Sequence, residues 1–227
     1  MTAVVLHISD IHIRSEKDWI LDKAVNIADC TYSSLPEASV VFIVVSGDIA
    51  FSGKVEQYSE AIKLFQGIRS AIEAEKQLPV HFVFCAGNHD CDFSLGNKTR
   101  TLALDGVRAD PSQFDESILE TGAALQIAFR NFEETLTTPT ETRMGDILWT
   151  CHRFTVERKE IIIDSLNVAW CSNLHETPGS LIFPHERYTR HLNEASDVRL
   201  SVLHHPLNWF SQASYRPFRE LIRGVAN

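Results

Sequence analysis

The chain has 227 residues, enough for one domain with a full hydrophobic core. Its content of 44% hydrophobic and 22% charged residues is ordinary for a globular protein in water. The net charge of −9 argues against a broad surface for nucleic acid or anionic membranes. It does not exclude a local site for an anionic substrate, because bound divalent cations can outweigh the protein's own charge there.

The five cysteines are odd in number and include no CxxC pair, which favours a reducing cytosol over a disulfide scaffold. The N-terminal residues show no basic segment followed by a long apolar stretch, as a signal peptide would. The longest apolar run, residues 40–45, is far too short to span a bilayer. We therefore expect a cytoplasmic protein without a membrane partner.

Apolar runs alternate with helical patterns in the first ninety residues. Residues 3–8, 39–46 and 80–86 predict strands, and the second run is apolar enough to be covered on both faces. Between them, apolar residues at helical spacing predict helices over residues 16–33 and 55–75. This β-α-β-α-β order implies parallel strands joined by right-handed crossovers.

The pattern weakens after Cys91. Residues 92–113 are polar and contain glycines and a proline, so they predict a loop, and residues 92–142 together predict a possible cap or lid insertion. Short strands are predicted next, and they favour a second, meandering sheet. The remaining predicted elements are helices over 116–136, 186–193 and 217–224 and strands over 147–156, 160–164, 168–171 and 198–203.

Side chains suited to metal ions follow four of the predicted strands. If these strands are neighbours, their carboxyl ends meet at one edge, where unpaired charged and imidazole groups are costly without cations. Mixed oxygen and imidazole donors suit Mn, Fe or Zn, and two such ions roughly 3.5–4 Å apart can clamp a phosphoryl group. The side chains are Asp10 and His12, then Asp48, then Asn88 and His89, then His204 and His205.

In chain order these side chains form the motifs Asp10-x-His12, Gly47-Asp48, Gly87-Asn88-His89-Asp90 and His204-His205-Pro206. Together the motifs resemble the calcineurin-like metallophosphoesterase family over essentially the whole chain. The resemblance implies an α/β protein, a four-layer α/β/β/α sandwich, which we expect as a single domain over residues 1–227. It also implies two divalent metal ions (Mn, Fe or Zn) as cofactors.

The resemblance assigns roles to these side chains. Asp10 and His12 would hold the first ion, and Asp48 would bridge both ions. Asn88 and His204 would hold the second ion.

The resemblance also implies the chemistry of the site. His89 would contact the phosphate and protonate the leaving oxygen as a general acid, while a metal-bound hydroxide attacks phosphorus directly. Two alternatives stay open. His205 is the alternative to His204 as a ligand, and Asp90 either orients His89 or caps the following turn.

The predicted function is therefore di-metal hydrolysis of a phosphomonoester or phosphodiester substrate. The family pattern closes with a Gly-His-x-His motif that does not occur before Asn227. We therefore expect a C-terminally incomplete domain that binds metal weakly by itself, with further domains beyond Asn227. The alternatives are a catalytically impaired regulatory or scaffold module, and a nuclease within a larger protein, although the charge does not indicate nucleic acid.

Overall fold

Two sheets form the centre of the protein in a computed structural model that describes residues 2–137, 142–192 and 194–225. The first sheet is parallel, and its strands are β1 (Ala3–Ile8), β2 (Val40–Val45) and β3 (Val80–Phe84), in that order. The second sheet is β4 (Thr142–Gly145), β5 (Trp149–Val156), β6 (Lys159–Leu166) and β7 (Val198–Val202). It is antiparallel except for its parallel β6–β7 pair.

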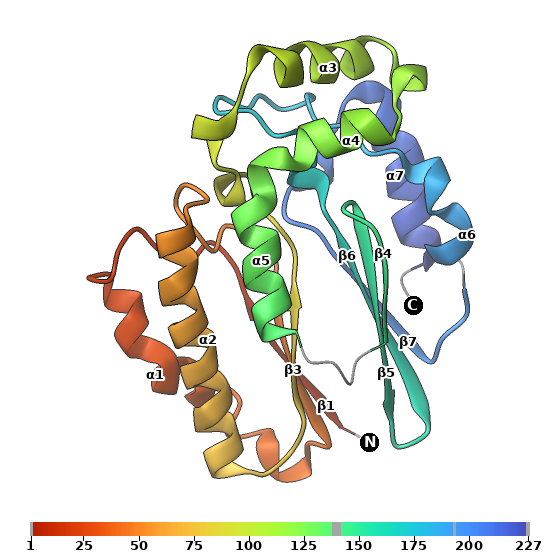
Figure 1. Cartoon of the computed structure of the whole chain (residues 1–227). Coiled ribbons are helices and arrows are strands. Elements are labelled where there is room, and N and C mark those ends of the chain that lie inside the picture. The colour runs from red at the N-terminus through yellow and green to blue at the C-terminus, as the bar shows by residue number, and fades with distance from the viewer. Residues whose placement is uncertain (1, 138–141, 193, 226–227) are drawn as a thin grey trace.

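Helices cover the outer faces of both sheets (Figure 1). The first sheet packs against α1 (Ala24–Asp29), α2 (Val55–Glu75) and α5 (Ile127–Leu136). The second packs against α6 (Thr189–Leu192) and α7 (Gln212–Val225), whereas α3 (Lys98–Ala109) and α4 (Glu116–Ala123) lie beyond one end of the sheets and join the same apolar cluster (Figure 1). The layers are therefore helix, sheet, sheet and helix, which confirms the α/β sandwich.

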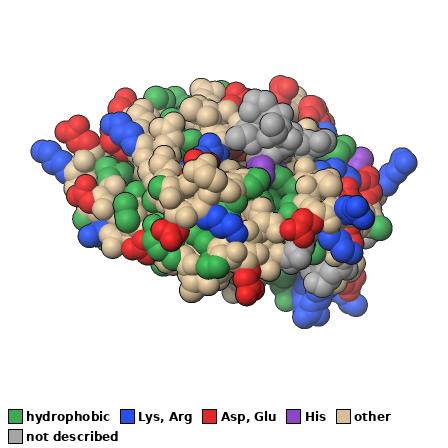
Figure 2. All heavy atoms as spheres, turned by 90° about the horizontal axis from the view of Figure 1, so that it is seen from below, with side chains coloured by type: hydrophobic (Ala, Val, Ile, Leu, Met, Phe, Trp, Pro, Cys, Tyr) green, Lys and Arg blue, Asp and Glu red, His purple; other side chains and the backbone are tan. Residues whose placement is uncertain are grey.

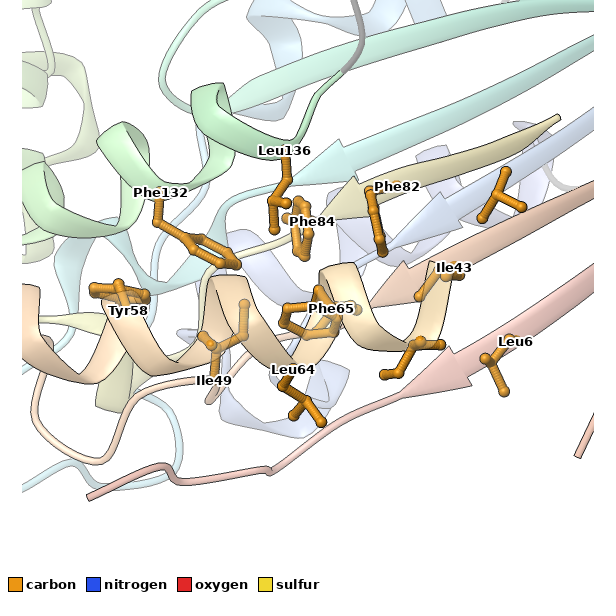
Figure 3. Close-up of a cluster of buried hydrophobic side chains, with 14 of the residues drawn as sticks. Leu6, Ile43, Ile49, Tyr58, Leu64, Phe65, Phe82, Phe84, Phe132 and Leu136 are labelled. Atoms are coloured by element: carbon orange, nitrogen blue, oxygen red, sulfur yellow. The ribbon is translucent and has the colours of Figure 1, made fainter. Parts of the chain in front are cut away.

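The layers are held by three apolar clusters. Between the first sheet and its helices, Phe65, Phe84 and Phe132 stack edge to face or tilted, with ring centroids 4.9 to 6.0 Å apart (Figure 3). Between the two sheets, Phe42 of β2 packs on Phe154 of β5. All six residues of β2 are buried, because one face meets the helices and the other meets the second sheet.

The predictions for the first half fit the structure best where burial is continuous. The predicted helix over 55–75 is confirmed as α2, and the strands are confirmed with small changes at their ends. The helix predicted over 16–33 is confirmed only over the residues of α1, which a 3-10 turn over 19–23 precedes. Trp19, which was expected to pack, is 70% exposed.

The predicted loop over 92–113 is also wrong, since it contains α3. The side chain of Asn97 caps this helix by accepting the N–H of Arg100. Arg100 is buried, and its guanidinium donates to the carbonyls of Gly122, Trp170 and Ser172. These bonds attach a largely polar helix to the rest of the domain. Whether residues 92–142 act as a cap stays a prediction.

Four later elements differ from their predictions. The helix over 116–136 divides into α4 and α5 around a 3-10 turn, and the strand over 168–171 is a buried 3-10 turn. The helix over 186–193 consists of a 3-10 turn followed by α6, and residue 193 lies outside the described residues. The last helix begins at Gln212, before the predicted 217, because the Ser211 carbonyl and hydroxyl accept the N–H groups of its first turn.

Within the described residues, no helix has both the length and the apolar character that crossing a bilayer requires. The end of the molecule at which β1 begins carries acidic and basic side chains side by side (Figure 2). Among the described residues in this view, the basic side chains are interspersed with acidic ones and form no broad basic surface.

Candidate metal centre

The loops after β1 and β2 run side by side beyond the sheet. The N–H of Asp10 donates to the carbonyl of Gly47 at 3.1 Å, and the N–H of His12 donates to the carbonyl of Asp48 at 2.9 Å. A parallel bridge between Ile13 and Ala50 continues the ladder. The backbone therefore holds the two predicted metal motifs against each other at the carboxyl edge of the sheet.

Three candidate ligands have a left-handed backbone. The φ angles are 56° at Asp10, 53° at His12 and 57° at Asp48. A residue with a Cβ loses about 1–2 kcal/mol in this conformation, although Asp and His tolerate it better than most. Strain of this kind is typical of functional sites, where the surrounding structure imposes it.

Two glycines allow the close contacts of the site. A Cβ on Gly87 would lie 2.1 Å from Oδ1 of Asp48, and a Cβ on Gly47 would lie 2.6 Å from Nδ1 of His204. Gly47 also has a φ of 104°. Larger residues at either position would displace a candidate ligand.

Asp90 lies beneath the site and is fully buried. Burial raises its pKa to about 6, against the opposing effect of its hydrogen-bond donors. The carboxylate binds the loop that carries Asp48, and by accepting the N–H of Gly87 it also closes the turn that carries His89. It accepts, at 2.8 to 3.1 Å, the N–H groups of Gly87, Asp48, Ile49 and Ala50 and the hydroxyl of Tyr58. Whether Asp90 orients the His89 ring stays a prediction.

Two groups of ligand atoms meet above this loop. One consists of His12, Asp48 and His89, the other of Asp10, Asp48 and His204, and in each the atoms lie within 4.8 Å of one another. Oδ2 of Asp48 is 3.4 Å from Nε2 of His204 and 3.7 Å from Nε2 of His12. Its Oδ1 accepts the backbone N–H of His89 at 2.9 Å. Asp48 is thus common to both groups.

The protonation states differ among these residues. Burial disfavours the ionised form of Asp48, but its hydrogen bond with His204 and nearby imidazoles outweigh burial and lower the pKa of Asp48. Burial also lowers the pKa of His12 and so favours the neutral imidazole, the form that binds cations. Burial opposes protonation of His204, but Asp48 prevails and raises the pKa of His204 to about 9. A cation must displace that proton.

The two adjacent histidines face different partners. Nδ1 of His204 donates to the Ser46 carbonyl at 2.8 Å, which directs Nε2 toward Asp48. Nε2 of His205 donates instead to the buried carboxylate of Glu176 at 2.9 Å. Asn88 begins the 3-10 turn whose next residue donates to Asp48, so it lies at the same edge.

Phe51 is a residue of the site that sequence reasoning missed. Its carbonyl accepts Nδ1–H of His89 at 2.7 Å, and its ring lies 5.5 Å from the His89 ring. The ring is 38% exposed, and the guanidinium carbon of Arg14 lies 4.2 Å from its centroid. An exposed aromatic residue three positions after Asp48 was the signal available in the sequence.

The donor set fits divalent cations. A shared carboxylate, a second carboxylate and imidazole nitrogens that converge within 4.8 Å are the donors that transition metals prefer. The carboxylates supply negative charge, and the burial of Asp48 makes that charge costly without a positive partner.

A family model described as calcineurin-like phosphoesterase matches residues 3–225. No curated protein matches the chain significantly. The family match spans every strand and helix described above, including the four sequence motifs at the candidate centre.

Proposed function

The chain belongs to the calcineurin-like phosphoesterase family, and from this premise we propose that it hydrolyses phosphomonoesters or phosphodiesters with two bound divalent cations, Mn, Fe or Zn. The family supports a metal-dependent phosphoesterase in general. The substrate, the metals and the residue roles are our proposal.

The observation that carries the proposal is the position of Asp48 in both groups of ligand atoms. A carboxylate with one oxygen directed at two different imidazoles is suited to lie between two cations. Two ions held by a common ligand stay close enough to contact one phosphoryl group, whose charge they would neutralise while activating water.

We propose five ligands. Asp10 and His12, whose Oδ1 and Nε2 atoms lie 3.8 Å apart, would hold one ion, Asn88 and His204 would hold the other, and Asp48 would be shared by both. The groups of nearby ligand atoms place Asp10 with His204 instead, so that pairing is the competing assignment. His204 is preferred over His205 because His205 is engaged with Glu176.

His89 is proposed as the general acid. Its Nδ1–H donates to the carbonyl of Phe51, which can only accept, so this bond fixes the ring and leaves Nε2 to carry the transferred proton. Because His89 also falls in one group of ligand atoms with His12 and Asp48, a ligand role is the competing assignment.

Hydrolysis of bis-p-nitrophenyl phosphate with added Mn²⁺ tests the function. We expect turnover in the wild type and a loss of at least about a hundredfold in Asp48→Ala and His89→Ala. Arg216→Ala, on an exposed face of α7, is the matched control and should keep full activity. An inactive wild type that still binds Mn²⁺ tightly would favour the regulatory or scaffold module instead.

Calorimetry with Mn²⁺ separates the two roles of His89. If His89 is the general acid, the His89→Gln variant loses turnover while its Mn²⁺ affinity stays within about twofold of the wild type. If His89 is a metal ligand, the variant loses Mn²⁺ affinity as well, by about tenfold or more.

A further inference from the structure

We propose that Arg14 is a substrate-binding residue that recognises a second phosphate group on the ester, next to the phosphate that is hydrolysed. This inference rests on the proposed function, and it adds a class of substrate: a phosphoester with two neighbouring anionic groups. The evidence is the arrangement of Arg14, Phe51 and Asp18 beside the candidate metal centre.

Phe51 connects Arg14 to the site. The Arg14 guanidinium lies over the Phe51 ring at 4.2 Å, in the geometry of a cation–π contact. The same ring lies 5.5 Å from the His89 ring and 6.4 Å from the His12 ring. The guanidinium is therefore one aromatic ring away from the proposed acid. At that distance it would meet a group beyond the scissile phosphate rather than that phosphate itself.

The loop that carries Arg14 is fixed, but its positive charge is not neutralised by an ion pair. The carboxylate of Asp18 accepts the backbone N–H groups of Arg14 and Ser15, and the first of these bonds is the main cause of its lowered pKa. In the described part of the chain, the Arg14 side chain forms no ion pair within 4.0 Å. Asp18 thus anchors the backbone, and although its charge attracts Arg14, the two side chains are not close enough to form an ion pair.

Lys54 shows the opposite arrangement. It also follows a metal motif, but its ammonium group binds both oxygens of Asp92 and the hydroxyl of Ser94, at 2.6 to 2.8 Å. Of these two cations, Arg14 is the one available for a substrate anion.

A hollow of about 930 Å³ gives the substrate room beside Arg14. It is lined by Asp10 and His12 at the site and extends past Arg14 to Trp19, which is 70% exposed. An ester bound beside Asp10 and His12 would therefore have room to extend along this hollow. A guanidinium can bind two oxygens of one phosphate at once, so the geometry favours a phosphate over a single carboxylate oxygen or a neutral group.

The test compares two esters that differ by one phosphate: thymidine 5′-(p-nitrophenyl phosphate) and its 3′-phosphorylated form. With Mn²⁺ present, we expect the wild type to show roughly tenfold higher kcat/KM for the 3′-phosphorylated ester, mainly through KM. Arg14→Ala should abolish this preference, so that the two esters are hydrolysed with equal kcat/KM. Arg14→Lys should keep part of the preference, because lysine keeps the positive charge but lacks the paired N–H donors of the planar guanidinium. Arg216→Ala should keep all of it.

Binding without turnover keeps the proposal testable even if neither ester is hydrolysed. Calorimetric titration with thymidine 3′,5′-bisphosphate and with decathymidylate should show tighter binding to the wild type than to Arg14→Ala for at least one ligand. The tighter of the two identifies a small nucleotide or a nucleic-acid strand as the source of the second phosphate. Equal binding of both ligands by the two proteins, or an unchanged ester preference in Arg14→Ala, would overturn the role of Arg14. Failure of hydrolysis alone would count only against the proposed function.

Discussion

Two aspartates are fully buried, one in each half of the molecule, and they are stabilised in different ways. Asp90, below the candidate metal centre, receives four backbone N–H groups and a tyrosine hydroxyl, all of them neutral donors. Asp164, in the second sheet, binds the guanidinium of Arg199 at 2.6 and 3.2 Å and the indole N–H of Trp149 at 2.7 Å.

The difference follows from what each region does. A guanidinium beside Asp90 would place a positive charge next to Asp48, where it would repel the cations that the site is proposed to bind. Neutral donors position the Asp48 loop and leave the negative charge of the site intact. Among the described residues Asp164 belongs to neither group of ligand atoms, so a full ion pair there does not compete with a cation.

The largest expected loss of stability comes from a substitution in the second sheet. Arg199→Leu leaves Asp164 buried without its cation and should lower the free energy of unfolding by about 3–5 kcal/mol in urea denaturation. Mn²⁺ affinity of the folded protein should not change. The double variant Asp164→Leu/Arg199→Leu should recover most of the loss, and a single variant as stable as wild type would contradict the role of this pair.

Asp90→Asn should cost less stability but affect function. The amide group turns an acceptor into a donor toward N–H groups, so we expect a loss of about 2–3 kcal/mol. Because Asp90 positions Asp48, Mn²⁺ affinity should also fall by about tenfold or more. Asp164→Asn is the matched control, expected to lose stability without losing affinity. Equal Mn²⁺ affinities of Asp90→Asn and wild type would remove the contrast between the two regions.

Gly87→Ala tests the space beside Asp48. The new methyl group would overlap the Asp48 carboxylate, so stability should fall by about 1–2 kcal/mol and Mn²⁺ affinity should fall with it. Gly224→Ala, where nothing lies within 4 Å of the added methyl group, should leave both unchanged or raise stability slightly. Thermal unfolding and calorimetry measure the two effects.

Tyr58→Phe removes one of the five donors to Asp90. The remaining four still hold the carboxylate, so the loss should be about 1 kcal/mol, with Mn²⁺ affinity nearly unchanged. A loss as large as that of Asp90→Asn would mean that the hydroxyl, rather than the backbone donors, fixes the carboxylate.

The buried thiols of the two regions should be equally unreactive, and this can be measured on the wild type without any substitution. Cys85 and Cys91 near Asp90, and Cys151 and Cys171 in the second half, are buried, whereas Cys30 is exposed. Burial raises the pKa of Cys85 to about 12 and that of Cys171 to about 11, which suppresses the reactive thiolate. An aromatic disulfide reagent at pH 8 should therefore titrate one thiol in the folded protein and five in guanidinium chloride. Rapid reaction of a second thiol would show that one region opens more easily.

The sequence was most informative where every residue of an element is buried, and where residues suited to metal binding lie close together in the chain. Residues 40–45 are apolar throughout because both faces of β2 are covered, and α2 follows its apolar stripe to both ends. The prediction that the ends of separate strands would meet agrees with the geometry of Asp10, Asp48 and His204. The individual roles of these residues stay predictions.

The sequence was least informative where a polar residue acts on the backbone. Arg100 stabilises its region through three carbonyls, and Asp90 acts through four N–H groups, and neither kind of contact leaves a pattern in the sequence. The division of residues 16–33 was missed because Trp19 reads as a core residue by type, yet it lies at the surface. Such features depend on tertiary contacts between residues that are distant in the chain.

The left-handed backbone at Asp10, His12 and Asp48 has a consequence for how this chain evolves. Glycine would relieve the strain at each position, so selection for heat resistance alone should replace these residues, Asp10 first because it is the most exposed of the three. A laboratory lineage selected for survival at high temperature without an activity requirement should therefore lose these proposed metal ligands early. A lineage selected for both properties should keep them and gain its heat tolerance at other positions.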